Sequence, residues 1–267
     1  NYEPIVMGQT MFLSSSRNDS VTAIDTTTGK ELWRFYADGP VRFAPVASRG
    51  RIYFGADDGY IYCVSAESGA LLWRKAAKPA SRKAIGSERV ISVWPIRGGP
   101  VLYNDQVYFT AGVWPFEGVL LYQFPVAANQ QKAPSFQSRT LNSLTPQGYA
   151  VAAGGRVYLP CGRGISACLD LESDQMLPLS YGGKTDYHVT ALGDFIFHGN
   201  QVYNVPEKRV LKSDVHRPVN GPDGVVGTRG DEIVGLNAKN PTFVEVVDRK
   251  GNKQKVQILP VAWKMTR

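Results

Sequence analysis

The sequence predicts an all-β fold made of repeated four-stranded antiparallel units, and two observations support this prediction. Gly29 recurs as Gly69 and Trp33 recurs as Trp73, both at a spacing of 40 residues, and the residues around them align. Apolar and polar residues alternate between these anchors, as they do in half-buried strands. One such unit cannot bury its apolar face alone, so copies must stack around a shared core. The sequence therefore predicts a β-propeller.

The second repeat shows the four strands of one blade most clearly. We expect strands at 45–47, 52–55, 60–65 and 71–74. Short turns rich in Asp, Ser and Gly separate them, and Gly69 supplies the positive φ that a tight hairpin turn needs. This order predicts an antiparallel meander in which each strand pairs with the next one along the chain.

An apolar triplet after a short polar turn marks the second strand of each unit, because aromatic and β-branched residues favour strands. The triplets are Met11–Leu13, Ile52–Phe54, Val107–Phe109, Val157–Leu159, Phe195–Phe197 and, more weakly, Ile233–Gly235. From this count we expect five or six blades in the chain, as part of a ring of about seven or eight.

The domain organisation follows from the spacing of these triplets. We expect a single propeller domain over 1–267, with an inserted loop at 76–95 where the step between units lengthens. Asn1 already lies next to the first expected strand, so we expect the chain to be a fragment of a longer one. The remaining blades or a neighbouring subunit would then cover the edge strands.

The charge and composition of the chain limit the kinds of partner that it can bind. The net charge is +7, and six basic residues fall within 74–89. This basic segment favours an anionic partner such as an acidic glycan, with a solvated loop as the alternative. The sequence contains no nucleic-acid-binding motif and no apolar run long enough for a transmembrane segment. Three cysteines are too few for a disulfide framework, although Cys161 and Cys168 flank an expected hairpin turn.

Residues 23–33 resemble the tryptophan-docking motif of PQQ-like (quinoprotein-type) propellers, and residues 56–73 resemble its next repeat. The resemblance extends more weakly over 95–175. The segment 94–122 looks most like uncharacterised PQQ-repeat proteins from planctomycete-type bacteria. This resemblance implies a structural role for four residues, in which each glycine makes an outer hairpin and each indole packs into the neighbouring blade. They are Gly29, Trp33, Gly69 and Trp73.

The family includes both enzymes and scaffolds, so the fold does not decide the function. A quinoprotein dehydrogenase would bind PQQ and calcium and, in the alcohol-oxidising branch, carry two adjacent cysteines. No adjacent pair of cysteines exists here, but sugar-oxidising members lack it too. Three histidines, His188, His198 and His216, have no spacing typical of a zinc site. The glycine-rich string 162–167 mimics a dinucleotide fingerprint but joins two expected strands.

One set of residues stands out as a candidate binding site. Arg42 and Arg97 each lie three residues before the proline that opens the first strand of a unit. In propellers this innermost strand lines the axis, so two guanidinium groups would point into one space and suit a carboxylate, phosphate or sulfate. Trp94 and Trp114 would line the same space, and Glu117 would provide a counter-charge. Alternatively, the arginines bridge blade loops and the tryptophans fill the blade junction.

Together these arguments predict a non-catalytic propeller that acts as a protein–protein interaction scaffold, or that binds an anionic ligand or glycan through its axial funnel. We expect no cofactor, no catalytic residue and no metal site. A PQQ-dependent alcohol or sugar oxidoreductase, with PQQ and calcium, is the alternative. The resemblance further implies a bacterial protein in the periplasm or otherwise outside the cytoplasm.

Overall fold

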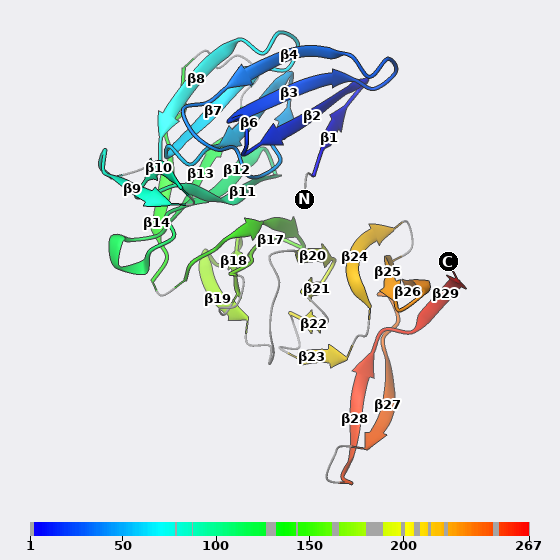
Figure 1. The fold of residues 1–267 in the computed structure, drawn as a ribbon. Helices are drawn as coiled ribbons and strands as arrows, with labels where there is room; N and C mark the ends of the chain where they lie inside the picture. The colour runs from blue at the N-terminus through cyan, green and yellow to red at the C-terminus, as the bar shows by residue number, and fades with distance from the viewer. Residues whose placement is uncertain are drawn as a thin grey trace. The chain divides into compact units, whose positions relative to one another are not determined.

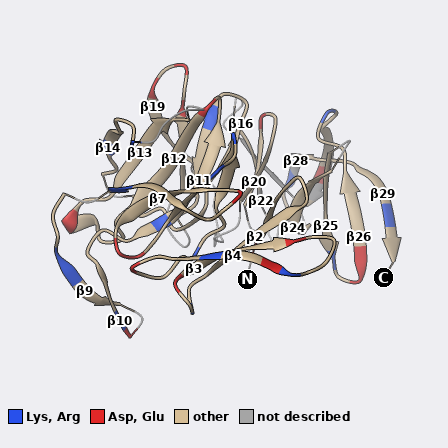
Figure 2. Ribbon diagram, turned by 90° about the horizontal axis from the view of Figure 1, so that it is seen from above, with Lys and Arg blue, Asp and Glu red and all other residues tan. Residues whose placement is uncertain are grey.

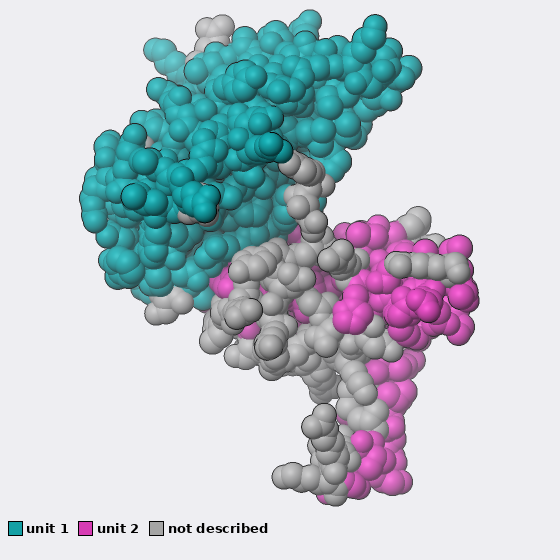
Figure 3. All heavy atoms as spheres, in the orientation of Figure 1, with its two compact units in different colours: residues 1–150 teal, residues 151–267 magenta. Residues whose placement is uncertain are grey.

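The computed structural model forms two compact units, residues 1–150 and 151–267 (Figure 3). Nearly all regular structure in the described residues is β-strand, so the predicted all-β class is confirmed. The structure describes residues 3–77, 79–86, 88–126, 132–142, 144–161, 166–179, 189–198, 201–205, 209–212, 215–221, 224–247 and 251–266.

The first two sheets of unit 1 are four-stranded antiparallel meanders in which each strand pairs with the next (Figure 1). Both follow the strand positions that the repeats predict. The first contains β1 (Ile5–Met7), β2 (Thr10–Ser15), β3 (Ser20–Asp25) and β4 (Glu31–Tyr36). The second contains β5 (Val46–Ser48), β6 (Arg51–Gly55), β7 (Tyr60–Ser65) and β8 (Leu71–Ala76).

A two-stranded hairpin and a five-stranded sheet complete unit 1. The hairpin, β9 (Lys83–Gly86) and β10 (Arg89–Ser92), forms within the segment expected as an inserted loop. The sheet contains β11 (Ile96–Tyr103), β12 (Gln106–Ala111), β13 (Leu120–Pro125) and β14 (Gln137–Thr140), with the 3₁₀ turn η1 (Pro115–Glu117) before β13. A short strand, β15 (Gly148–Tyr149), pairs in parallel with β11.

Unit 2 contains three sheets within the described residues. The first contains β16 (Val151–Ala153), β17 (Arg156–Leu159), β18 (Ser166–Asp170) and β19 (Gln175–Leu179). The second contains β20 (Val189–Leu192), β21 (Phe195–His198), β22 (Gln201–Asn204) and β23 (Arg209–Lys212), extended by β28 (Lys253–Ile258) and β27 (Thr242–Val247). The third contains β24 (His216–Gly221), β25 (Gly224–Arg229), β26 (Glu232–Leu236) and β29 (Val261–Thr266).

The last sheet differs from its predicted placement. The triplet Ile233–Gly235 lies on β26, which is the third strand of this sheet and not the second. The second strand is β25, whose sequence Gly224–Arg229 contains no aromatic residue. The β27–β28 hairpin intervenes between β26 and β29 and joins the neighbouring sheet instead. The fourth strand of the blade is thus displaced along the sequence.

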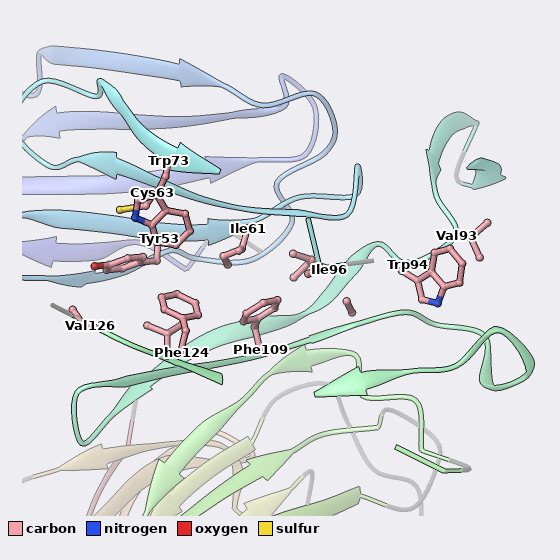
Figure 4. Close-up of a cluster of buried hydrophobic side chains, with 13 residues drawn as sticks. Tyr53, Ile61, Cys63, Trp73, Val93, Trp94, Ile96, Phe109, Phe124 and Val126 are labelled. Atoms are coloured by element: carbon pink, nitrogen blue, oxygen red, sulfur yellow. The ribbon is translucent and has the colours of Figure 1, made fainter. Parts of the chain in front are cut away.

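Apolar side chains pack between successive sheets of each unit. One cluster in unit 1 joins the first and second sheets through Phe12, Val21, Phe54 and Tyr62. Another joins the second and third sheets, where aromatic side chains from β6, β8, β12 and β13 meet (Figure 4). Face-to-face packing of consecutive meanders is the arrangement that the repeat pattern requires. In unit 1 this packing brings the loop before β5, the turn after β6 and the end of β10 together around Asp57.

Candidate functional site

A fully buried acidic residue, Asp57, lies at the centre of the candidate site in unit 1. It follows β6 in a tight turn, and its side chain has an exposed fraction of 0%. Its backbone N–H donates to the carbonyl of Pro40 at 2.9 Å, and its carbonyl accepts from the N–H of Ser92 at 2.8 Å. The loop before β5 and the end of β10 therefore hold this turn from both sides.

Two arginines hold the Asp57 carboxylate. Arg42 donates from Nε to Oδ2 at 2.7 Å. Arg97 donates from Nε to Oδ1 at 2.7 Å and from Nη2 to Oδ2 at 2.9 Å, which is a bidentate pair. The arginine side chains keep 25% and 17% of their surface exposed. A buried carboxylate needs such partners because an uncompensated charge in the interior is strongly destabilising.

The structure therefore brings Arg42 and Arg97 together, as the sequence predicts. The anion that both of them bind is the carboxylate of Asp57 in the same chain. The two positive charges and one negative charge leave this cluster with a net charge of about +1. Nη1 and Nη2 of Arg42 and Nη1 of Arg97 make no hydrogen bond to another described residue. Sequence reasoning missed Asp57, because Ala-Asp-Asp-Gly is also the composition of an ordinary turn.

The predicted tryptophans and Glu117 lie in a neighbouring contact and not on the arginine pair. Trp94 is only 4% exposed, and its Nε1 donates to the backbone carbonyl of Glu117 at 3.0 Å. The Glu117 carboxylate accepts two hydrogen bonds from Arg82, at 2.6 and 2.9 Å. The Arg82 guanidinium also lies 5.9 Å from the Trp94 ring centre. Trp114 is partly buried against the cluster between the second and third sheets.

The β9–β10 hairpin is fixed at both ends. At its base, Arg82 binds Glu117 next to η1. On β10, Arg89 binds both carboxylate oxygens of Asp19 and the carbonyl of Ser16 at 3.3 Å. These contacts use two of the six basic residues in 74–89, and Figure 2 shows basic residues on β9. The hairpin is therefore held against the rest of unit 1 by ion pairs at both ends.

The two faces of this hairpin differ. Ala84 and Ile91 pair across the strands and lie toward the interior, with Ile91 3% exposed. Ile85 and Val90 pair on the opposite face and are 83% and 64% exposed. The hairpin therefore exposes an apolar pair on its outer face. The two apolar residues of each strand are adjacent in the sequence, so the sequence does not show which of them faces the interior.

Of the residues predicted to dock neighbouring blades, Trp33 and Gly69 meet between the first and second sheets, and Trp73 packs between the second and third. Trp33 on β4 donates from Nε1 to the carbonyl of Ala66 at 3.0 Å. Its ring lies over Gly69, where an added Cβ would come within 2.6 Å of the indole. Trp73 on β8 packs with its ring centre 5.6 Å from that of Phe124. Its Nε1 has no hydrogen-bond partner among the described residues.

Other candidate groups in the described residues lie elsewhere. Cys63, Cys161 and Cys168 are all buried, and none of them forms a disulfide. Oγ of Ser166 lies 3.3 Å from Nδ1 of His198, and both residues are buried. A cavity of about 480 Å³ in unit 2 is lined in part by Asp194 and includes none of the predicted site residues. His188 and the string 162–165 lie outside the described residues.

The described part of the chain offers no group of three or more His, Cys, Asp or Glu side chains suited to a metal ion. Among the same residues, no helix has the length and apolarity to cross a membrane.

Stacked four-stranded meanders joined by docking tryptophans define a PQQ-like β-propeller. A family model described as outer membrane protein assembly factor BamB (PQQ_2) matches residues 3–197, and the chain belongs to this family.

Individual proteins resemble the chain less closely. Tetrathionate hydrolase of Acidithiobacillus ferrooxidans is 31% identical over 85 residues, which cover 31% of this chain and 17% of that protein. The crystal structure of BamB from Moraxella catarrhalis matches with a TM-score of 0.56 at 14% identity, over 95% of this chain and 74% of that one. U3-55K matches with a TM-score of 0.58 at 13% identity, over 97% and 78%. At these identities the two structures show the fold alone.

Proposed function

We propose that this chain is a non-catalytic protein-interaction scaffold that presents the β9–β10 hairpin to a protein partner. The observation that carries the proposal is the exposed pair Ile85 and Val90, at 83% and 64%, on a hairpin fixed at both ends. A fixed hairpin loses little conformational freedom when a partner binds, so more of the contact energy remains as affinity. The description of the matching family as an assembly factor supports the same function.

The expected partner is an extended protein segment with apolar and acidic side chains. Apolar side chains of the partner would cover Ile85 and Val90, while Lys83 and the net charge of +7 favour acidic neighbours. An extended segment can also pair with a free strand edge of a small sheet. The family description places its namesake at the outer membrane, so we propose that this contact takes place outside the cytoplasm.

A matched pair of double variants tests the proposal. The probe is a labelled synthetic peptide with alternating apolar and acidic residues, and binding is measured by fluorescence anisotropy. Ile85→Ser with Val90→Ser should weaken binding at least about tenfold, or about 1.4 kcal/mol. Leu32→Ser with Leu71→Ser removes two apolar side chains that are also about half exposed, and should leave binding unchanged. Equal effects of the two double variants would contradict the proposal.

A direct assay separates the scaffold from the enzyme alternative. The purified chain is mixed with PQQ and calcium, and its absorption spectrum and the reduction of a dye by alcohols and sugars are recorded. The scaffold proposal expects no substrate-dependent dye reduction above that of the mixture without protein. Dye reduction that requires the chain would contradict the non-catalytic function.

An anion or acidic glycan at the arginine cluster is a second candidate. The supporting observation is that Arg42 and Arg97 keep guanidinium nitrogens without a hydrogen bond to another described residue, on side chains that are partly exposed. A ligand carboxylate or sulfate would bind beside Asp57, which already accepts from Nε of Arg42 and from Nε and Nη2 of Arg97. Calorimetric titration with sulfate and glucuronate tests it, with Arg42→Gln as the weakened variant. Identical heats for the variant and the unmodified chain would rule it out.

A further inference from the structure

A cavity of about 480 Å³ lies between the second and third sheets of unit 2. The β20–β21 turn and the residues beside it form one wall, which includes Leu192, Asp194 and Phe195. The segment after β26 contributes Ala238 and Lys239 to the other wall. Every residue that lines the cavity belongs to unit 2, so one unit alone forms its walls. Its volume lies within the range of small-molecule sites, about 300–1,000 Å³.

The cavity has an apolar floor and a charged rim. Phe195 and Ala238 are 9% and 8% exposed, and with Leu192 they belong to the apolar cluster that joins the two sheets. Asp194 and Lys239 are exposed, and they come from the two different sheets. This arrangement suits a ligand whose apolar part is covered and whose charged groups stay near the mouth of the site.

Both charged side chains of the rim keep hydrogen-bonding capacity. The ammonium of Lys239 makes no ion pair with another described residue, while its backbone N–H donates to Oδ1 of Asn237 at 2.8 Å. Asp194 forms an ion pair with Nη1 of Arg156 at 3.6 Å, which is longer than a hydrogen bond. The rim therefore offers one hydrogen-bond donor with a positive charge and one acceptor with a negative charge.

One side of the cavity corresponds to a docking turn of unit 1. At the first junction of unit 1, the indole of Trp33 donates to the carbonyl of Ala66, which directly follows the third strand of the next sheet. Ala238 and Lys239 lie two and three residues after the third strand of the last sheet. In the sheet before it, the strand register gives the docking position to Leu211 in place of a tryptophan. An aromatic ring is thus the group that a regular junction of this fold packs at this place.

We propose that this cavity binds a free aromatic amino acid, such as tryptophan. The aromatic ring packs on Phe195 and Ala238, the α-ammonium group binds Asp194, and the α-carboxylate binds Lys239. Two opposite charges from two sheets suit a zwitterion, because a ligand with one charge would leave the other side chain unmatched. The site lies in unit 2 and is independent of the β9–β10 hairpin, so it adds a small-molecule function to the proposed scaffold.

Calorimetric titration with three related ligands tests the site. Tryptamine lacks the carboxylate of L-tryptophan, and indole-3-propionate lacks its ammonium group. Lys239→Gln should weaken the binding of tryptophan about three- to tenfold, the contribution of a partly exposed charged contact, and leave that of tryptamine unchanged. Asp194→Asn should weaken the binding of tryptophan by a similar factor and leave that of indole-3-propionate unchanged. Lys253→Gln, which changes a lysine on β28 that is 72% exposed and does not line the cavity, should bind all three ligands like the unmodified chain.

Three results would overturn the proposal. They are the absence of saturable binding of tryptophan to the unmodified chain, binding of tryptophan that neither variant weakens, and binding of uncharged indole as tight as that of tryptophan. Thermal unfolding without ligand checks the fold of the Asp194→Asn chain, which also loses the ion pair with Arg156. If that chain is unfolded, Lys239→Gln decides the result, because the Lys239 ammonium has no partner among the described residues.

Discussion

The two sheet junctions of unit 1 contain the same repeated tryptophan but are held together differently. At the first junction, Trp33 covers Gly69 and its indole N–H is hydrogen-bonded to the next sheet. At the second junction, Trp73 packs among aromatic rings without a hydrogen-bond partner among the described residues. The Asp57 cluster lies at this second junction, where Arg97 reaches it from β11. The two junctions thus share the repeated tryptophan, but its hydrogen bond is present only at the first, and the Asp57 cluster is present only at the second.

Removal of the Asp57 carboxylate should give the largest effect, because it leaves two partly buried guanidinium groups without their anion. We expect Asp57→Ala to lower the free energy of unfolding by about 3–5 kcal/mol, measured by urea denaturation. Asp57→Asn keeps the shape and serves if the alanine variant does not fold. Asp105→Asn is the control, because Asp105 pairs with Arg49 at 2.7 Å on the surface, with 64% and 43% exposure, and should cost about 0–1 kcal/mol. An Asp57→Asn variant as stable as this control would show that charge does not hold the second junction.

Matched glycine substitutions isolate the contribution of the indole to the first junction. Gly69 and Gly29 have nearly the same φ, 69° and 70°, so an alanine at either position meets the same backbone strain of about 1–2 kcal/mol. Only at Gly69 does the new Cβ also collide with Trp33, which should add about 1–3 kcal/mol. Thermal and urea unfolding of Gly69→Ala and Gly29→Ala measure this difference. Equal losses of stability would mean that the ring moves aside without cost.

The sequence predicted the first junction better than the second. Gly69 and Trp33 follow from a repeat, because the same local geometry recurs at a fixed spacing. Arg42 and Arg97 could also be found, since each lies three residues before a proline, although β11 already begins at Ile96 and therefore includes Arg97. Their partner Asp57 could not, because an acidic residue in a turn is normally solvated and only the packing of three loops buries it.

The last sheet shows the same limit. The fourth strand of this sheet, β29, was not predicted, because the β27–β28 hairpin separates it from β26 along the sequence, and spacing then no longer indicates which strands pair. Burial also could not be predicted for Trp94, whose indole binds a backbone carbonyl. A local pattern indicates which strands form, whereas insertions and loop packing decide which polar groups meet.

Alkaline pH should weaken the second junction. Burial raises the pKa of the Cys63 thiol from an ordinary 9.0 to about 12, and that of the Tyr53 hydroxyl from 10.0 to about 12. In the unfolded chain these groups lose their protons at the ordinary values, so stability is retained below about pH 9 and falls as the pH rises toward 12. Urea midpoints between pH 8 and 11 measure the fall. Cys63→Ala should make it less steep, whereas an unchanged slope would exclude the thiol as a cause.

The smallest effect on global stability should come from Arg89, which binds Asp19 from the β9–β10 hairpin beside the second junction. Its side chain is 41% exposed, so Arg89→Ala should cost only about 0–1 kcal/mol in urea denaturation. The local effect should be larger, because the hairpin loses its contact with the first sheet. Hydrogen exchange of the amides in β9 and β10 should then become faster, while exchange in β6 and β7 stays the same. Unchanged exchange in β9 and β10 would show that Arg82 and the buried Ile91 hold the hairpin without Arg89.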